Sequence, residues 1–301
     1  MDHRPERMES AMSGYDSKYL LKPASRLLLL LIVTYFAGPG YADTVTVKIG
    51  GSGGPLAGMR VLAEAYKKAH PDARVTVVAN LGSSGGIKAV VAGAIDVAVS
   101  SRPLKPAEIE QGVVGIEYAR AAFVFATSRK APTAGMTLSQ LAGVYRGDIT
   151  AWPDGQRLRL ILRPEHDSAS ATLRKISPEM NDAISIAQKR PGLVVAPTDD
   201  DSIEAIDKTP GSLGTITLAQ LVSEKRRTTP LAVDGVKPSV KTLAEGKYPV
   251  SVTFYLAVNS LPNPSVQRFI AFVQSKSGQA VLARSGHWVA PKASSRDGVT
   301  F

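Results

Sequence analysis

Hydrophobic positions along residues 43–301 follow two kinds of pattern, short alternating or continuous apolar runs and longer runs with helical spacing. The first kind predicts strands, at 44–49, 75–79, 96–100, 118–127, 158–162, 212–217 and 250–258. The second kind predicts helices, at 55–69, 87–93, 106–111, 136–145, 171–176, 182–189, 202–208, 218–224, 265–274 and 277–285. Because strands and helices alternate, we expect an α/β protein with parallel strands and helices on both faces.

Two long apolar runs, 118–127 and 250–258, have similar length and composition and bracket the central block of the chain. This arrangement predicts that the chain leaves one lobe, builds a second and returns. We expect lobe 1 to comprise residues 43–126 and 250–301, and lobe 2 to comprise residues 127–249. Each lobe is expected to be a mainly parallel sheet flanked by helices, with the two long runs as crossing strands at the hinge.

The N-terminal segment has the features of a targeting signal. Residues 27–38 form a short apolar run behind basic residues, and the small-x-small pattern GYA follows at 40–42. A run of this length is too short to span a bilayer comfortably and is typical of a signal peptide. We therefore expect residues 1–42 to be a signal peptide cleaved near Ala42, and the protein to be periplasmic.

The composition excludes several classes of function. The 301-residue chain has no cysteine, which excludes disulfides, thiol catalysis, cysteine-ligated zinc and an acylated-cysteine anchor. Its 4 histidines show no metal-ligand spacing, so neither a metal nor a cofactor is expected. The formal net charge of +10 favours anionic ligands, but aromatic residues make up only 6% and basic residues are scattered, which argues against nucleic acid.

Four of the predicted strands end in small hydroxyl or glycine residues. The carboxyl ends of parallel strands share one edge of a sheet, where helix N-termini present unpaired N–H groups. Glycine lets a ligand approach the backbone closely, and serine and threonine add further donors. The residues that form this candidate site for a compact oxyanion are Ser52, Gly53, Ser83, Ser84, Ser101, Ser168, Ser170 and Thr172.

Two charged residues complete the candidate site. Arg163 directly follows the strand predicted at 158–162 and could present a fork of charged donors. Asp167 admits two interpretations, a helix N-cap or an acceptor for a protonated ligand. A buried acceptor would tolerate hydrogen phosphate and repel sulfate, because fully ionised sulfate has no proton to donate.

The same loops suggest an enzyme as an alternative. Residues 50–54 and 82–86 both match the G-x-S-x-G elbow of a serine-dependent α/β hydrolase, with Ser52 or Ser84 as nucleophile and His287 as base. The motif occurs twice, however, and no HGGG oxyanion loop is present. We therefore expect the protein not to be an enzyme.

Six segments carry a resemblance to a known family: GSGGPL, NLGSSGGIKAVVAGAIDVAVSSRPLKPAE, VYRGDITAWPDG, TPGSLGTITLAQL, DGVKPSVKTLAEGKYPVSVTFYLAV and FIAFVQSKSGQAVLARSGHWV. In their order they resemble the phosphate-binding subunit of the phosphate ABC transporter, a type II periplasmic binding protein. The resemblance implies two α/β lobes that close on one dehydrated phosphate. It also implies a monomer that hands this ligand to a membrane ABC permease.

The resemblance implies ligand contacts at Ser52, at Ser83 or Ser84, and at Arg163. Residues 168–172 cover the family's hydroxyl-rich helix start, although HDSASAT departs from its usual pattern. Ser101 stands where some members have an aspartate that accepts the phosphate proton. Two alternatives therefore stay open, namely a binding protein for another oxyanion, such as sulfate, tungstate or molybdate, and a phosphate sensor.

Overall fold

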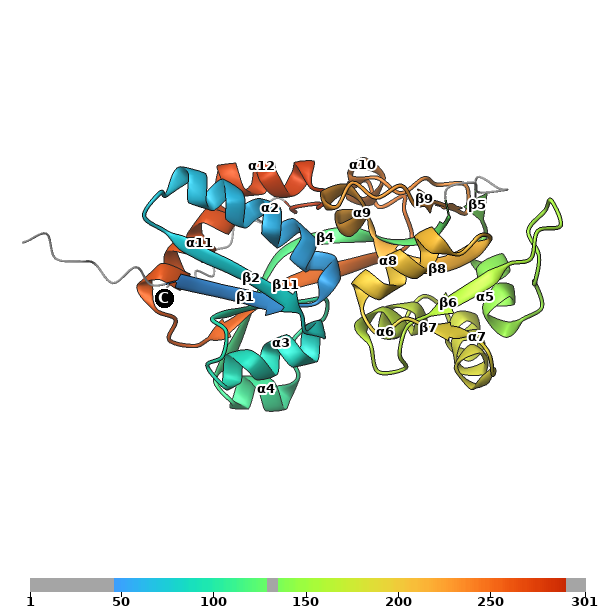
Figure 1. Ribbon diagram of the computed structural model, residues 1–301, viewed down its shortest axis with the longest axis horizontal. Helices are drawn as coiled ribbons and strands as arrows, with labels where there is room; N and C mark the ends of the chain where they lie inside the picture. The colour runs from blue at the N-terminus through green and yellow to red at the C-terminus, as the bar shows by residue number, and fades with distance from the viewer. Residues whose placement is uncertain (1–45, 129–134, 291–301) are drawn as a thin grey trace, which may run out of the picture. The chain divides into compact units, whose positions relative to one another are not determined.

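The computed structural model describes residues 46–128 and 135–290, which belong to one compact unit, Thr44–Phe301. The predicted signal peptide, residues 1–42, lies outside the described residues. Nine of the described strands form one sheet (Figure 1).

The first half of this sheet is parallel. Its strands, in spatial order, are β2 (Arg74–Asn80), β1 (Thr46–Gly51) and β3 (Val97–Ser100). The helices that follow these strands are α2 (Gly53–Ala69), α3 (Gly82–Val91) and α4 (Pro106–Glu110). Val97 and Val99 pack in the same apolar cluster as α2, whereas Ala98 packs in that of α3. Successive side chains of β3 thus point to opposite faces of the sheet, one covered by α2 and the other by α3.

Two long strands, β4 (Val113–Thr127) and β11 (Ser251–Asn259), join the halves of the sheet. On one side β11 is antiparallel to β3, and on the other it is antiparallel to residues 113–122 of β4. Residues 123–126 of β4 are antiparallel to β8 (Ser212–Thr217). Because β4 pairs with strands of both halves, the prediction of a crossing strand is confirmed for β4.

The second half is parallel from β8 onward. Its further strands are β6 (Arg159–Leu162) and β7 (Val194–Val195). Its helices are α5 (Leu138–Arg146), α6 (Ser168–Arg174), α7 (Pro178–Lys189), α8 (Asp199–Lys208), α9 (Leu218–Ser223) and α10 (Val240–Ala244). Four short strands were not predicted: β7, which pairs with β6, β5 (Gly135–Met136), which pairs with β10 (Ala232–Val233), and β9 (Thr229–Pro230), which pairs with β4.

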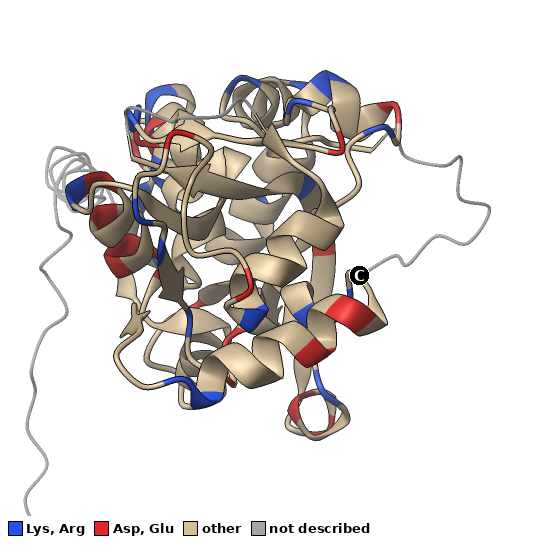
Figure 2. Cartoon of the chain, turned by 90° about the vertical axis from the view of Figure 1, so that its right-hand side faces the viewer, with Lys and Arg blue, Asp and Glu red and all other residues tan. Residues whose placement is uncertain are grey.

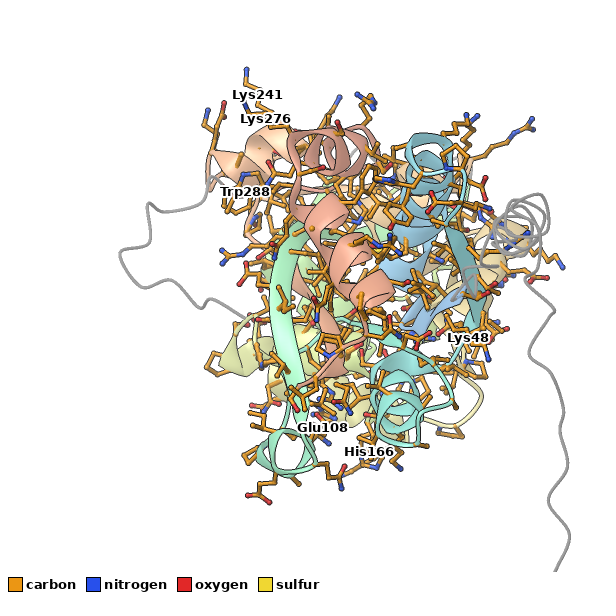
Figure 3. The ribbon with its side chains drawn as sticks, turned by 90° about the vertical axis from the view of Figure 1, so that its left-hand side faces the viewer. Lys48, Glu108, His166, Lys241, Lys276 and Trp288 are labelled. Carbon is orange, nitrogen blue, oxygen red and sulfur yellow. The ribbon has the colours of Figure 1, made fainter. Side chains whose placement is uncertain are left out.

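The last described elements return to the first half. They are α11 (Pro264–Gln274) and α12 (Lys276–Arg284), which lie beside α2 (Figure 1). Trp288, labelled in Figure 3, then exchanges two backbone hydrogen bonds with Arg120 of β4, at 2.7 and 2.8 Å. The guanidinium of Arg120 also lies 5.5 Å from the centre of the Trp288 ring. These contacts fasten the end of the described chain to the shared strand.

Buried apolar side chains form separate clusters in the two halves. The largest lies in the second half and includes Phe125, Tyr145 and Ile161. Another lies between α2, α11 and the first-half strands and includes Leu56 and Phe269. Two cores of this kind, each with parallel strands flanked by helices, confirm the predicted two-lobed α/β class. The boundaries proposed for the lobes stay a prediction.

The predicted start of α3 is wrong. The pattern placed residues 82–86 in a loop before a helix at 87, but the helix begins at Gly82 and contains both Ser83 and Ser84. The side-chain oxygen of Asn80 accepts a hydrogen bond from the backbone N–H of Gly82 at 2.9 Å, which satisfies one donor of the first turn. Glycine and serine have low helix propensity and show no apolar periodicity, so the sequence pattern did not predict this first turn.

The surface combines charges of both signs. Figure 2 shows lysine and arginine residues interspersed with aspartate and glutamate residues over the side that it displays. Among the described residues, no helix combines the length and apolarity that a membrane crossing would need.

His287 is fully buried against α2. Its Nδ1 lies 3.0 Å from the carbonyl oxygen of Ser285, and its ring lies near the rings of Tyr118 and Phe254. A Cβ atom at Gly58 would lie 2.2 Å from Cε1 of His287, so α2 can approach this ring only where it lacks a side chain. Burial lowers the pKa of His287 to about 4, an effect that its backbone hydrogen bonds partly oppose.

We expect Gly58→Ala to lower the free energy of unfolding by about 2 kcal/mol, because the new methyl group overlaps a buried, rigid ring. Gly85→Ala in α3 is the matched control, since its Cβ would meet only Leu81 Cβ, at 3.4 Å. The control should gain up to about 1 kcal/mol from helix propensity. Urea unfolding of both variants measures the difference, and equal stabilities would contradict the packing argument.

We expect stability to fall as the pH drops from about 6.5 toward 4. The folded chain holds His287 at a pKa of about 4, so the unfolded chain binds this proton more tightly. This stabilisation is fully present above the unfolded pKa and is lost as the pH falls through the folded value. Over the whole range it amounts to about 3 kcal/mol. Urea unfolding at several pH values should show a shallower slope for His287→Gln, and an unchanged slope would disprove the assignment.

Candidate functional site

The N-terminus of α2 supplies the first donors of the site. Ser52 is the N-cap of α2, yet its buried side chain caps no backbone N–H of the helix. Its Oγ lies 3.0 Å from Oγ of Ser101 and donates to Oδ2 of Asp199 at 3.1 Å. The backbone N–H of Gly54 donates to the same Asp199 oxygen, also at 3.1 Å. Two donors at one helix N-terminus therefore hold a carboxylate that comes from α8.

The turn after β3 lies beside the start of α3. The backbone N–H of Ser101 donates to Oγ of Ser83 at 3.0 Å. Nη2 of Arg102 donates to Oγ of Ser84 at 3.0 Å, and the guanidinium makes two further hydrogen bonds to Glu108, at 2.7 and 2.9 Å. These bonds lower the pKa of Glu108, which Figure 3 labels. The side chain of Ser83 therefore holds the backbone of Ser101 in place. Ser84 is exposed and bonds to Arg102, the partner of Glu108.

Arg163 lies at the end of β6 and is only 4% exposed. Its Nη1 donates to the carbonyl oxygen of Ala196 at 2.7 Å, and its Nη2 donates to Oδ2 of Asp167 at 3.0 Å. Nη2 also forms an ion pair with Oδ1 of Asp199 at 3.5 Å. The Nε of Arg163 is buried and has no acceptor among the described residues. Asp199 thus connects the arginine of the second lobe with Ser52 of the first.

Asp167 is the N-cap of α6, as one of its two interpretations predicts. Its Oδ1 accepts from the backbone N–H of Ala169 at 2.8 Å. Burial raises the pKa of Asp167, the positive charge of Arg163 opposes this, and the negative charge of Asp199 adds to the rise. The centre of the site therefore holds one guanidinium between two carboxylates.

The hydroxyl groups at the start of α6 turn toward the backbone. Oγ of Ser170, which is fully buried, donates to the carbonyl oxygen of Arg163 at 3.3 Å. Oγ1 of Thr172 donates to the carbonyl oxygen of Ser168 at 2.9 Å. Ser168 and Thr172 also line a pocket of about 470 Å³ together with Ser101 and residues of β11. This pocket therefore takes its walls from both lobes.

The predicted residues divide into two groups. One hydrogen-bonded network, joined by Asp199, contains Ser52, Ser83, Ser101, Arg163 and Asp167. Gly53 makes close contact with Asp199 of this network. Four others lie around it: Ser84 bonds to Arg102, Ser170 bonds to the carbonyl oxygen of Arg163, and Ser168 and Thr172 bond to each other. Whether any of these residues binds a ligand stays a prediction.

Sequence reasoning missed Asp199 and Asn80. The three aspartates at 199–201 are typical of a solvated helix start, but Thr198 is the N-cap of α8, and Asp201 is its capping partner. Asp199 takes no part in this capping box and instead accepts hydrogen bonds from Ser52 and Gly54 of the other lobe. Asn80 ends β2, and a Cβ atom at Gly53 would lie 2.4 Å from its Nδ2, a buried donor without an acceptor among the described residues.

The hydrolase alternative receives no support from the geometry. His287 is buried beside Gly58, and no hydrogen bond within the described ranges joins it to Ser52 or Ser84. A base that activates a serine must lie within hydrogen-bond reach of its hydroxyl. The elbow-like sequences therefore start helices without forming a serine–histidine pair.

Two α/β lobes that share a strand and direct donors from both sides toward one point define a two-lobed binding protein. A sequence model of the PBP superfamily domain matches residues 37–277. The phosphate-binding protein PstS of Borreliella burgdorferi is 30% identical over 253 residues, which cover 80% of this chain and 88% of the relative. The chain belongs to the PBP superfamily and, within it, to the PstS family.

Solved structures show the same fold at lower identity. A Clostridium perfringens protein, described as a phosphate ABC transporter substrate-binding protein with bound phosphate, is 22% identical with a TM-score of 0.69. The match covers 82% of this chain and 100% of the Clostridium perfringens chain. An ABC-type phosphate transport receptor from Vibrio cholerae is 21% identical with a TM-score of 0.59, covering 81% of this chain and 100% of that chain.

We expect Arg163→Ala to lower the free energy of unfolding by about 3–5 kcal/mol, because it leaves Asp167 and Asp199 without their shared buried cation. Arg60→Ala, at an exposed position of α2, is the matched control and should change stability by less than about 0.5 kcal/mol. Chemical denaturation of both variants provides the comparison. A loss at Arg163 no larger than that of the control would show that the two carboxylates do not depend on it.

Proposed function

We propose that this protein is a periplasmic solute-binding protein that captures inorganic phosphate between its two lobes for delivery to an ABC permease. One observation carries the proposal. Ser52 and Gly54 of the first lobe and Arg163 of the second contact the two oxygens of a single carboxylate, with donor–acceptor distances of 3.1 to 3.5 Å. A carboxylate and a phosphate present similar oxygen acceptors, so this donor set suits an oxyanion.

The ligand is named from the chemistry and from the relatives together. The names of the relatives refer to phosphate, and the family of the Borreliella burgdorferi protein is the one to which this chain belongs. Asp167 is the proposed acceptor for the proton of hydrogen phosphate, a proton that sulfate lacks. Ser101, adjacent to Ser52, is a proposed further donor. Closure of the lobes would remove water and strengthen each of these hydrogen bonds.

The remaining parts of the proposal follow from the same family. The chain is exported, its signal peptide is removed near Ala42, and the protein acts as a monomer that meets a membrane permease. Lobe 1 comprises 43–126 and 250–301, and lobe 2 comprises 127–249. The protein binds and releases its ligand without chemical change.

We expect phosphate-stripped protein, titrated calorimetrically, to bind one phosphate with a dissociation constant that is micromolar or tighter. This corresponds to a binding free energy on the order of −8 kcal/mol or more negative. Ser52→Ala should weaken this binding roughly tenfold or more, because it removes a buried hydroxyl donor from a charged ligand. Ser265→Ala on α11 is the matched control and should bind as the wild type does.

Competition identifies the ligand. Sulfate, arsenate and tungstate are added to the phosphate complex, and arsenate alone should displace phosphate readily, because it has the same shape and carries a proton. Displacement by sulfate or tungstate would replace phosphate by another oxyanion. Absence of heat with every anion, or turnover of an ester that Ser52→Ala abolishes, would overturn the binding function itself.

A further inference from the structure

Asp199 occupies the donors that the proposed function assigns to the ligand. Its Oδ2 accepts from Oγ of Ser52 and from the backbone N–H of Gly54, and its Oδ1 faces Nη2 of Arg163 at 3.5 Å. Gly54 lies in the first turn of α2, where backbone N–H groups have no partner within the helix. An oxyanion that used these same donors would have to replace the carboxylate.

Space at this point also excludes simultaneous binding to the same atoms. A Cβ atom at Gly53 would lie 2.8 Å from Cβ of Asp199 and 3.1 Å from its Oδ2. The aspartate side chain therefore lies directly against the glycine backbone of the α2 N-terminus. No layer of ligand atoms fits between two groups in van der Waals contact.

Charge leads to the same result. Arg163 already faces two carboxylates, Asp167 at 3.0 Å and Asp199 at 3.5 Å, so these three side chains sum to one negative charge. The other nearby arginine, Arg102, is neutralised by its paired Glu108. A phosphate added beside both aspartates would meet net repulsion in a poorly solvated place, whereas a phosphate that replaces Asp199 would not.

From these contacts we propose that Asp199 is an affinity-determining residue of the site, an internal carboxylate that competes with the oxyanion ligand for Ser52, Gly54 and Arg163. Because Asp199 belongs to α8 of the second lobe and its partners Ser52 and Gly54 to the first, the same contact links the two lobes. The proposal rests on the proposed function, since it concerns the anion that this function assigns to the site.

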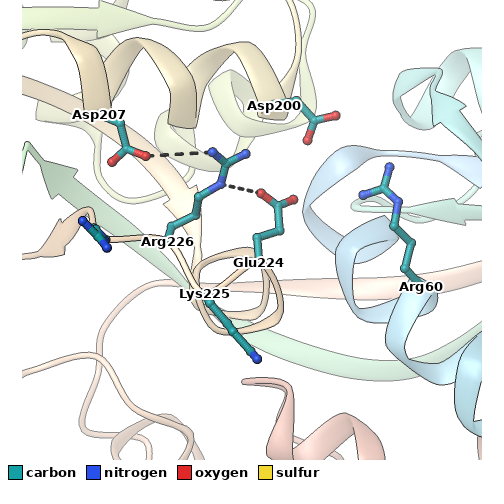
Figure 4. Close-up of a pocket in the computed structure, with 7 residues that line it drawn as sticks. Arg60, Asp200, Asp207, Glu224, Lys225 and Arg226 are labelled. Carbon is teal, nitrogen blue, oxygen red and sulfur yellow. Dashed lines mark hydrogen bonds and ion pairs between the residues drawn. The ribbon is translucent and has the colours of Figure 1, made fainter.

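The neighbouring aspartate has a different environment, which makes it a control. Asp200 lines another pocket, of about 880 Å³, together with Arg60, Glu224 and Arg226 (Figure 4). Its Oδ1 accepts from Nε2 of Gln220 at 3.2 Å. Asp199 and Asp200 share a helix turn and a charge, and only Asp199 bonds to the α2 N-terminus.

The first test is calorimetric titration of the full chain with inorganic phosphate. Asp199→Ala should bind phosphate roughly tenfold or more tightly than the wild type, because its donors no longer have to be released. Asp199→Asn, which keeps the size and loses the charge, should also bind more tightly, and Asp200→Ala should match the wild type. Equal or weaker binding by both Asp199 variants would overturn the proposal and would make Asp199 a ligand contact or a bystander.

The second test requires no ligand to bind. In phosphate-free protein, amide hydrogen exchange at Gly54 should be roughly tenfold or more faster in Asp199→Ala than in the wild type or in Asp200→Ala, because its acceptor is gone. Unchanged exchange would disprove the carboxylate contact. If no variant binds phosphate, the proposed function and the competition both fail, whereas faster exchange in Asp199→Ala would still support the link between the lobes.

Discussion

Hydrogen bonding along β4 holds the two lobes in register, and the site depends on it. Residues 113–122 of this strand pair with β11 of the first half, and residues 123–126 pair with β8 of the second. Ala121 and Phe125 of the same strand belong to the apolar clusters of different lobes. Ser52 follows β1 and Arg163 follows β6, and both side chains contact Asp199. The donors of both lobes can therefore reach one oxyanion-sized group.

The burial of Arg163 determines which charged groups lie at the site between the lobes. A guanidinium removed from water requires acceptors, and the structure supplies a carbonyl oxygen, Asp167 and Asp199. Asp199 in turn accepts hydrogen bonds from Oγ of Ser52 and from the backbone N–H of Gly54 at a helix N-terminus. One buried cation thus organises the polar groups of two lobes, and the net negative charge around it disfavours a second anion unless a carboxylate leaves.

Most of the fold could be predicted from periodicity because the long elements bury one or two continuous apolar faces. The errors were local. The start of α3 is rich in glycine and serine, which have low helix propensity, yet it is helical and its first turn bonds to Asn80 and Ser101. The strands β5, β7, β9 and β10 have two residues each, too few for any period to appear. Their positions follow from neighbours that are distant in sequence.

The candidate site divides in the same way. Strand ends rich in serine and glycine, followed by a lone arginine, were sufficient to predict an oxyanion site, because the end of a strand and the start of the helix that follows it are adjacent in the sequence. The sequence also determined the α/β class and the two lobes. Only the tertiary structure decided that Asp199, one of three consecutive aspartates, reaches Ser52 across 147 positions of the chain. Pairing over such a separation depends on how the lobes pack, and no local pattern encodes it.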